Sequence, residues 1–189
     1  MALEIERRFL PLDKNWRPEG DAEPITQGYF KLGESASARL VTWPWPHFVL
    51  NGERLFWLSL QQYRDLKTVT TADGTLPQGW KARVRCYFNT RYVLDIKGPR
   101  TGTTRFEMAE QPLTDATGKR LLALCGDTVL SKKRYAIPYH GYVWQVDVYE
   151  GEHKGLITCE IELPSPTTLF KIPPFVGEDI TDRKLFGNK

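Results

Sequence analysis

The chain has 189 residues, of which 41% are hydrophobic and 12% aromatic, a composition typical of a globular protein and not of a disordered one. This length is sufficient for a single well-buried domain and does not require two. The net charge of +3 is slight, so total charge gives no indication of a nucleic-acid partner.

The cysteines and the apolar segments bear on the compartment. Cys86, Cys125 and Cys159 are widely separated and lack the spacing of a metal site, which is typical of buried thiols in a reducing compartment. The first residues include two glutamates and no apolar segment of signal-peptide length. No run reaches the roughly 18 apolar residues of a membrane helix. We therefore expect a cytoplasmic protein without a membrane partner.

The first predicted element is a strand over residues 3–10, in which charged and apolar side chains alternate. Successive side chains of a strand point to opposite faces, so Glu4, Glu6 and Arg8 share one face. One such strand alone is typical of a solvated sheet edge. The same alternation recurs with matched charges in most later predicted strands, which favours a different interpretation.

Residues 33–79 form a predicted insertion after a short strand over residues 25–31 that carries Tyr29. The insertion is rich in aromatic residues, and Asn51-Gly52 is a strong hairpin signal. This pattern favours an extra hairpin packed on the domain body, with a lid or a partner-binding face as the alternative. The strands predicted within the insertion cover residues 38–43, 47–50 and 54–60, and residues 68–78 are predicted to form turns.

The middle of the chain is predicted to form a hairpin from residues 81–87 and 91–97. Its alternation places Arg83 and Arg85 on one face of the first strand, and Asp95 and Lys97 on one face of the second. A further strand over residues 103–108 presents Arg105 and Glu107 together.

A helix is predicted over residues 114–124, with Thr114 as its N-cap, Gly126 after its end, and Leu121, Leu122 and Leu124 as core contacts. The chain then continues with a hairpin of residues 129–135 and 142–149 around His140-Gly141, and a strand over residues 157–163. We expect a short helix to begin at Ser165-Pro166 and to end at Pro173-Pro174, and a last helical turn over residues 181–186.

The charges on these strand faces are sorted by sign along the chain. If the faces line the inside of a closed sheet, the interior is too polar for a dry core, because buried unpaired charge is costly. Several carboxylates are suitable ligands for Mg²⁺ or Mn²⁺, and a ring of Arg and Lys binds phosphate oxygens. A metal ion with a polyphosphate satisfies both halves. The carboxylates are Glu4, Glu6, Asp147, Glu160 and Glu162, and the bases are Arg83, Arg85, Lys97, Arg105, Lys132 and Arg134.

Taken together, these motifs resemble the CYTH, or triphosphate tunnel metalloenzyme, superfamily, whose mark is Glu-x-Glu-x-Lys near the N-terminus. The tail from Pro173 to Thr181 is similar to that of the bacterial inorganic tripolyphosphatases of the family. The resemblance covers most of the chain apart from residues 33–79. The matching motifs are Glu4-Ile5-Glu6-Arg7-Arg8, Gln27-Gly28-Tyr29, Arg83-Val84-Arg85, Asp95-Ile96-Lys97-Gly98, Arg105-Phe106-Glu107, Lys132-Lys133-Arg134-Tyr135, Asp147-Val148-Tyr149 and Glu160-Ile161-Glu162.

The resemblance implies one domain over residues 1–189, mainly β, built as a closed antiparallel eight-stranded barrel tunnel with a few flanking helices. Residues 173–189 are then a plug at one tunnel mouth. Tyr29 with Lys97 resembles the pair associated with inorganic tripolyphosphate. The resemblance implies a catalytic set of Glu4, Glu6, Arg8, Tyr29 and Lys97, metal ligands Glu4, Glu6, Asp147, Glu160 and Glu162, and phosphate ligands Arg83, Arg85, Lys97, Arg105, Lys132 and Arg134.

Two departures from the family pattern stand out. Arg8 replaces the usual lysine, and its very high pKa makes it unsuitable for proton transfer. The family often has a second acid two residues after the position of Glu107, but Ala109 occupies it here and Glu110 is out of phase. The insertion also leaves open an alignment in which Arg39 is the tunnel residue of its strand.

We expect metal-dependent hydrolysis of the terminal phosphoanhydride of inorganic triphosphate. One alternative keeps the tunnel but changes the substrate to a nucleoside or thiamine triphosphate, which the enzyme hydrolyses or cyclises. A second is a non-catalytic module that binds polyphosphate or a nucleotide, and a third makes the aromatic insertion a surface for a protein partner. The oligomeric state stays open, with a homodimer among the options.

Overall fold

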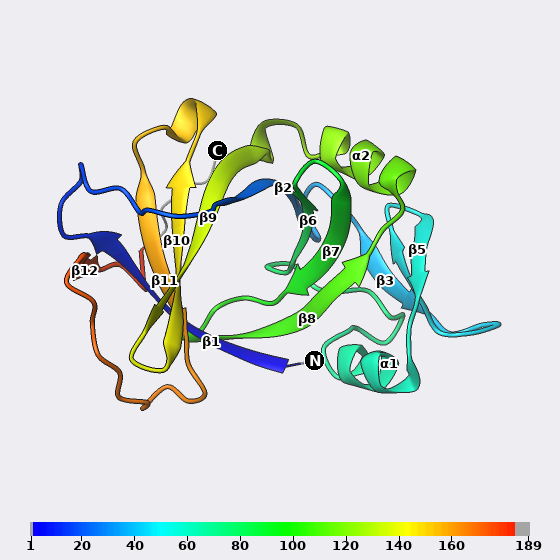
Figure 1. Cartoon of the computed structure of the whole chain (residues 1–189). Helices are drawn as coiled ribbons and strands as arrows, with labels where there is room; N and C mark the ends of the chain where they lie inside the picture. The colour runs from blue at the N-terminus through cyan, green and yellow to red at the C-terminus, as the bar shows by residue number, and fades with distance from the viewer. Residues whose placement is uncertain (1, 184–189) are drawn as a thin grey trace. The chain divides into compact units, whose positions relative to one another are not determined.

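The computed structural model describes residues 2–183 (Figure 1). The strands are β1 (Ala2–Pro11), β2 (Glu23–Lys31), β3 (Ala38–Val41), β4 (His47–Leu50), β5 (Glu53–Trp57), β6 (Lys81–Tyr87), β7 (Arg91–Lys97), β8 (Thr104–Pro112), β9 (Leu130–Tyr139), β10 (Tyr142–Tyr149), β11 (Ile157–Glu162) and β12 (Val176–Asp179). The helices are α1 (Leu60–Lys67) and α2 (Asp115–Leu124), with short 3-10 turns at Gly126–Thr128 and Gly151–His153. Within residues 2–183, neither helix has the length and apolar character needed to cross a membrane.

The main sheet confirms the predicted fold class. Its nine strands are hydrogen-bonded in the order β11-β10-β9-β2-β6-β7-β8-β1-β12, and β1 also pairs with β11. That additional pairing closes a ring through every strand except β12, which gives an eight-stranded antiparallel barrel. By packing, the chain divides into two compact units.

The first unit contains residues 26–99 and 106–129 together with the start of β1. Its centre is the β6–β7 hairpin, in which residue pairs run from Lys81↔Lys97 to Tyr87↔Arg91. Figure 1 shows α2 beside these two strands, and the α2 residue Gly118 has no space for a side chain, because a Cβ there would lie 2.2 Å from the Tyr92 ring. The predicted N-cap is confirmed, since the Thr114 hydroxyl accepts a hydrogen bond from the Thr117 backbone at 3.2 Å. Leu121 is buried as expected, but Leu124 is 60% exposed and is not a core contact.

The insertion forms a separate three-stranded sheet in the order β3-β4-β5, with the expected Asn51-Gly52 turn between β4 and β5. Phe48 and Leu50 are fully buried in the same hydrophobic cluster as Val84 of β6. This bears out the prediction of an extra hairpin packed on the domain body. Arg39 is exposed on β3, outside the barrel strands, so the structure does not support its alternative assignment as a tunnel residue.

Helix α1 was not predicted, because residues 54–60 read as a strand that runs on from the hairpin turn. Strand β5 ends at Trp57, and Ser59 begins the helix through a capping box: its side chain accepts from Gln62 N, and the Gln62 side chain accepts from Ser59 N. Only Leu66 of this helix is buried, so the helix has little apolar periodicity. The pair of Ser59 and Gln62 was the one sequence signal for its start.

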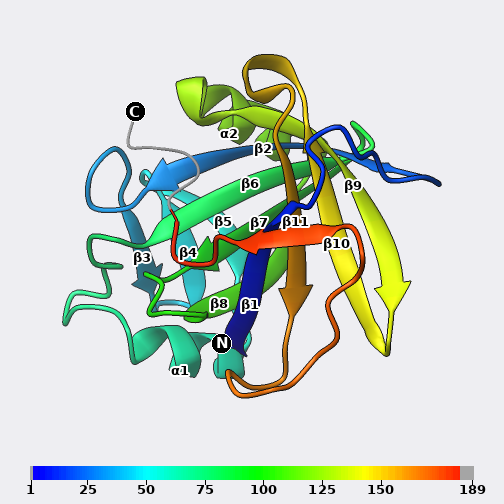
Figure 2. The same cartoon turned by 90° about the vertical axis from the view of Figure 1, so that its left-hand side faces the viewer.

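The second unit contains residues 4–25, 100–105 and the described residues from Leu130 onward. Figure 2 shows β9, β10 and β11 side by side, with β12 beside β1. The β9–β10 hairpin turns at His140-Gly141 as predicted, with both residues at positive φ, and Tyr139 pairs with Tyr142. The core of this unit is a cluster around Phe9, Trp144 and Ile161.

The tail differs from its prediction. Residues 163–175 form no helix, because Pro166 and Pro173 leave too short a stretch between them and only one turn forms, from Ser165 to Thr168. Strand β12 was not predicted and pairs with β1 at Phe9↔Asp179. The predicted plug is described only as far as Arg183, and the rest of the expected turn to Phe186 lies outside the described residues.

Candidate functional site

Each unit contains a cluster of buried, ion-paired side chains. In the first unit, Arg83 and Asp95 are directly opposite each other on β6 and β7. Arg83 Nε donates to the two carboxylate oxygens at 2.9 and 3.1 Å, and Asp95 is fully buried. Burial alone lowers the pKa of the Arg83 guanidinium, but the charge of Asp95 outweighs it and holds this pKa well above its usual value. The Arg83 guanidinium stays charged.

Arg85 has its main partner on β8. Its Nη1 lies 2.7 Å from Glu110 Oε1, and the Tyr87 hydroxyl donates to the same oxygen at 2.5 Å. Asp95 lies further away, at 3.8 Å from Arg85 Nη2. A second base of the predicted phosphate-binding set is thus held by carboxylates within the unit.

The contact between Arg85 and Glu110 corrects the expectation that Glu110 is out of phase. Ile96 pairs with Met108 and Leu94 pairs with Gln111, so β8 has one more residue than β7 over this stretch. This extra residue is a β-bulge, which rotates the strand and brings Glu110 to Arg85. The acid missing at Ala109 is therefore present one position later.

Lys97 and Tyr29 complete the predicted set of this unit. Lys97 Nζ forms an ion pair with Glu107 at 2.7 Å, and the two residues are opposite each other on β7 and β8. Tyr29 interacts electrostatically with Arg83, and its hydroxyl accepts a hydrogen bond from Gln27 Nε2 at 2.6 Å. Arg83, Arg85, Lys97 and Tyr29 thus lie among the strands of one unit.

The second unit has its cluster at β1 and β11. Arg8 is opposite Glu160 in the register, and its Nε donates to Glu160 Oε1 at 2.6 Å. Glu6 is 4% exposed, and its Oε1 is approached by guanidinium groups of Arg8 at 3.3 Å, of Arg105 at 3.4 Å, and of Arg100. Arg105 also contacts Glu4. Three arginines therefore converge on a single carboxylate oxygen.

The same unit holds a tighter group between β9, β10 and β11. Asp147 is fully buried; Lys132 Nζ lies 2.6 Å from its Oδ2, and Arg134 binds both of its oxygens at 2.7 Å. Arg134 also reaches Glu160 Oε2 at 3.3 Å, which links this group to Arg8.

Burial and neighbouring charge set the protonation of this group. Burial raises the pKa of Glu160, but the charges of Arg8, Arg134 and Lys132 outweigh it and hold this pKa well below its usual value. Burial and the like charge of Arg134 lower the pKa of Lys132 to about 7, against the attraction of Asp147. The carboxylates are therefore ionised at neutral pH.

Exposure separates the side chains that belong to the cluster from neighbours that do not. Glu162 is exposed, and its contact is with Gln145 Nε2 at 3.4 Å, so the structure does not bring it into the ion-paired group. It is, however, directly opposite Glu6 in the β1–β11 register. Lys133 is exposed and pairs with Glu150, in contrast to the buried Lys132. The exclusion of Lys133 from the basic set follows from its phase.

Sequence reasoning missed several charged residues of the two clusters. Asp95 and Glu107 were placed on predicted strands and Glu110 was placed after one, but none of the three was identified as a partner of the bases. Arg100 follows β7 in a loop, where no alternation marks it, and it binds Glu6. Burial and the nearby charge of Arg105 lower the pKa of Arg100.

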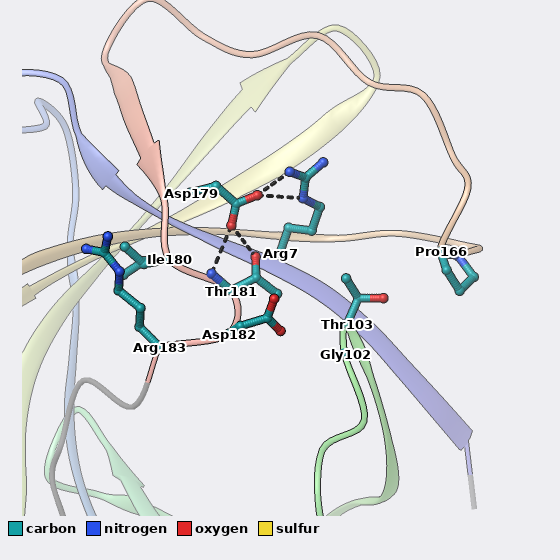
Figure 3. Close-up of a pocket in the computed structure, with 9 residues that line it drawn as sticks. All are labelled: Arg7, Gly102, Thr103, Pro166, Asp179, Ile180, Thr181, Asp182 and Arg183. Atoms are coloured by element: carbon teal, nitrogen blue, oxygen red, sulfur yellow. Dashed lines mark hydrogen bonds and ion pairs between the residues drawn. The ribbon is translucent and has the colours of Figure 1, made fainter.

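A pocket of about 470 Å³ also lies in the second unit (Figure 3). Arg7 Nε donates to Asp179 at 3.0 Å, and the Thr181 backbone donates to the same carboxylate at 2.8 Å. Arg7, Asp179 and Thr181 of its wall are thus paired with one another, and none of the predicted site residues lines the pocket. The lining residues are Arg7, Gly102, Thr103, Pro166, Asp179, Ile180, Thr181, Asp182 and Arg183.

Comparison with known proteins identifies the family. The chain is 34% identical over 132 residues to an inorganic triphosphatase of Acetivibrio thermocellus, and the match covers 68% of this chain and 84% of that protein. The chain belongs to the CYTH superfamily. No protein-family model matches it.

Solved structures agree on the CYTH fold. A crystal structure of the inorganic triphosphatase NE1496 has a TM-score of 0.52 and 22% identity, and covers 100% of this chain and 93% of that one. A second crystal structure, of the hypothetical protein NE1496, has a TM-score of 0.51 and 22% identity, and covers 98% and 95%. At this identity the likeness supports the CYTH fold alone.

The carboxylates of the second unit have the chemistry of a site for a hard divalent cation. In residues 2–183, however, no three His, Cys, Asp or Glu side chains are grouped closely enough to hold a metal ion. Glu4, Glu6, Asp147 and Glu160 are each bound to arginine or lysine instead. The oxygen donors therefore fit Mg²⁺ or Mn²⁺ in kind, and a metal ion would have to replace guanidinium groups around them.

Proposed function

We propose that this protein hydrolyses inorganic tripolyphosphate to phosphate and pyrophosphate, with Mg²⁺ or Mn²⁺ as its cofactor. The observation that carries the proposal is the buried charge of the second unit, where bases and carboxylates are both concentrated and almost balanced. Membership of a superfamily with an inorganic triphosphatase among its members supports it. The bases are Arg8, Arg100, Arg105, Lys132 and Arg134, and the carboxylates are Glu4, Glu6, Asp147 and Glu160.

The pairing suggests how a charged substrate enters without leaving unpaired buried charge. Removing one partner of a buried ion pair is strongly destabilising, because the other charge stays buried and uncompensated. A polyphosphate and a divalent ion bound together would avoid this cost, because the arginines would keep anionic partners in the phosphate oxygens and the carboxylates would keep a cationic one. Arg8 and Arg105 would then bind phosphate, and Glu6 and Glu160 would hold the ion. This exchange predicts that substrate and metal bind cooperatively.

The metal-binding role falls to the carboxylates that the family pattern marks. Glu4, Glu6, Asp147 and Glu160 would hold the ion, with Glu162 available at the open side opposite Glu6. A divalent ion held there would supply positive charge to the phosphate oxygens and would promote ionisation of the attacking water. The protein's bases neutralise the charge that develops on the pyrophosphate leaving group as water adds to the terminal phosphorus.

The first unit has its own set of candidate phosphate ligands. Arg83 and Arg85 present guanidinium groups that fit phosphate oxygens in a fork, and Lys97 presents a point charge. Each is held by a carboxylate of its own unit, which fixes its position before the substrate arrives. Such positioning contributes to the rate of phosphoryl transfer, because an enzyme catalyses this reaction mainly by orienting the substrate and stabilising its charge.

The direct test is phosphate release from tripolyphosphate by the purified protein. We expect turnover with Mg²⁺ or Mn²⁺, equal amounts of phosphate and pyrophosphate, and no turnover in EDTA. ATP and thiamine triphosphate in parallel assays test the alternative substrates. Binding of tripolyphosphate without turnover with either metal would overturn the proposal in favour of a binding module.

Adjacent lysines give a matched pair of variants for this assay. Lys132→Met removes a buried base of the cluster, and we expect it to lower kcat/KM by roughly 100-fold, as for other groups that stabilise charge in the transition state. Lys133→Met changes the same residue type one position away, at an exposed site paired with Glu150, and should stay within about twofold of wild type. Equal effects of the two changes would contradict the placement of the site.

A further inference from the structure

The side chain of Gln27 lies in the first unit, beside Tyr29, and has no role in the function proposed above. It is 3% exposed on β2, two residues before Tyr29 and therefore on the same face of the strand. Its Nε2 donates to the Tyr29 hydroxyl oxygen at 2.6 Å. Its Oε1 is buried and has no hydrogen-bond partner among the described residues.

This hydrogen bond decides what the Tyr29 hydroxyl can do next. A phenol has one proton to donate and can also accept, and a primary amide nitrogen can only donate. Because Gln27 Nε2 fills the accepting side of the oxygen, the hydroxyl proton points elsewhere and remains for another acceptor. A buried amide with one unpartnered atom is costly, which argues that this arrangement is retained for a ligand and not for folding.

The charges around Tyr29 indicate the kind of acceptor. Tyr29 lies within electrostatic range of Arg83, whose guanidinium stays charged. Lys97 and Arg85 belong to the same buried cluster. A donor hydroxyl among cations suits an anionic oxygen, and a phosphate oxygen is the one that the proposed function brings.

The backbone around Tyr29 is fixed independently of its side chain. Thr128 Oγ1 accepts from Tyr29 N at 3.0 Å and donates to Tyr29 O at 2.9 Å. Gly28 packs against Cys125, because a Cβ at Gly28 would lie 2.5 Å from the Cβ of that cysteine. With the strand held in this way, the direction of the hydroxyl depends on Gln27.

We propose that Gln27 is a positioning residue which, by donating to the Tyr29 oxygen, directs the Tyr29 hydroxyl proton onto a phosphate oxygen of the substrate. This inference rests on the proposed function, because it takes tripolyphosphate as the ligand. Gln27 itself does not touch the substrate. Its effect passes entirely through the Tyr29 hydroxyl.

The test is a double-mutant cycle on kcat/KM for tripolyphosphate. Gln27→Met keeps the length of the side chain without its amide, and Tyr29→Phe removes the hydroxyl. We expect each to lower kcat/KM roughly tenfold, the loss expected of one hydrogen bond to a charged group, and the double variant to be no worse than Tyr29→Phe alone. Additive losses would overturn the proposal, as would a Gln27→Met enzyme with wild-type kinetics.

An isosteric variant separates direction from packing. In Gln27→Glu a carboxylate replaces the amide. It accepts a hydrogen bond from the Tyr29 hydroxyl and so turns the hydroxyl proton away from the substrate, and we expect a larger loss of kcat/KM than in Gln27→Met. A Gln27→Glu enzyme close to wild type would overturn the proposal by showing that residue 27 accepts from the hydroxyl. Gln111→Met, on β8, is the control for loss of a glutamine, and thermal unfolding confirms that each variant is folded.

Binding provides a readout that does not require turnover. Calorimetric titration with a non-hydrolysable imido analogue of tripolyphosphate in Mg²⁺ should give the same double-mutant cycle in Kd, measured for the wild type, the two single variants and the double variant. If the wild type binds but does not turn over, the proposed hydrolysis fails while the role of Gln27 is still tested. A wild-type protein that neither binds nor hydrolyses tripolyphosphate overturns both.

Discussion

At the scale of single residues, the pKa of the Asp179 carboxylate is set by the groups that donate hydrogen bonds to it. Asp179, at the end of β12, accepts from Arg7 Nε on one oxygen and from Thr181 N and Oγ1 on the other. Burial raises the pKa of Asp179, but these hydrogen bonds outweigh it and lower the pKa below its usual value. The carboxylate ties the described end of the chain to β1.

The lowered pKa of Asp179 predicts a pH dependence of stability. Since the ionised form is favoured in the folded state, the unfolded chain takes up a proton at higher pH than the folded one. The contribution of Asp179 to the free energy of unfolding is therefore fully present above the unfolded pKa of roughly 4, and is lost as pH falls through the folded pKa. Urea unfolding should show wild type and Asp179→Asn separated by a constant amount between pH 5 and 7, and converging below about pH 4. A gap that widens in acid would contradict the assignment.

The face to which a charged side chain points could be predicted from the sequence for residues on regular strands, but not for residues in loops. Alternation alone placed Arg83 and Arg85 on one face, and the structure pairs them with buried carboxylates. Arg100 carries the same chemistry but lies in a loop, where no period marks the direction of a side chain. The reason is physical: side-chain direction alternates with a period of two residues along a strand, whereas it follows no period in a loop.

Elements show the same limit. Strands and hairpins with clear alternation or an Asn-Gly or His-Gly turn were predicted at their observed places, although β8 and β9 each extend four residues beyond the predicted end. Helix α1 and strand β12 were not, because α1 buries one residue and β12 is short. The bulge in β8 could not be seen either, since one extra residue looks in sequence like an acid that is out of phase. The partner strand is what reveals it.

The bulge in β8 predicts how the protein responds to deletion of Ala109. Deleting Ala109 leaves Met108, Glu110 and Gln111 opposite Ile96, Asp95 and Leu94, which is an uninterrupted ladder with Glu110 still on the face of Arg85. We expect this deletion to fold, with a thermal midpoint within a few degrees of wild type. Thermal unfolding followed by circular dichroism checks it.

A variant of unchanged composition is the control for this deletion. Exchanging the two residues, Ala109→Glu with Glu110→Ala, retains the bulge but moves the acid away from Arg85. Losing a hydrogen bond to a buried charged group costs roughly 2 kcal/mol, or about 4–8 °C in a domain of this size. If the exchange is tolerated and the deletion is not, the description of the bulge is wrong.

At the scale of the whole molecule, the insertion is part of the first unit's core and also exposes large apolar side chains. Phe48, Leu50 and Leu58 are buried in the cluster that supports β6 and β7, the strands of Arg83 and Lys97. Trp43 and Trp45 are 82% and 71% exposed in the same insertion. Removing residues 44–60 to ask whether the insertion binds a partner would therefore remove the core beneath the candidate site. The two roles have to be separated by point substitutions.

Burial, and not residue size, should decide the effect of those substitutions. Phe48→Ala empties a fully buried position, and the lost apolar contacts with the resulting cavity cost about 3–5 kcal/mol of the free energy of unfolding. Trp45→Ala removes a larger ring but exposes almost no new apolar surface, so the change should stay within about 0.5 kcal/mol. Urea unfolding measures both, and a Trp45→Ala loss as large as that of Phe48→Ala would mean that the tryptophan is covered in solution. The double variant Trp43→Ala with Trp45→Ala therefore tests whether the insertion binds a partner. Because both side chains are exposed, we expect this variant to keep full hydrolysis of tripolyphosphate.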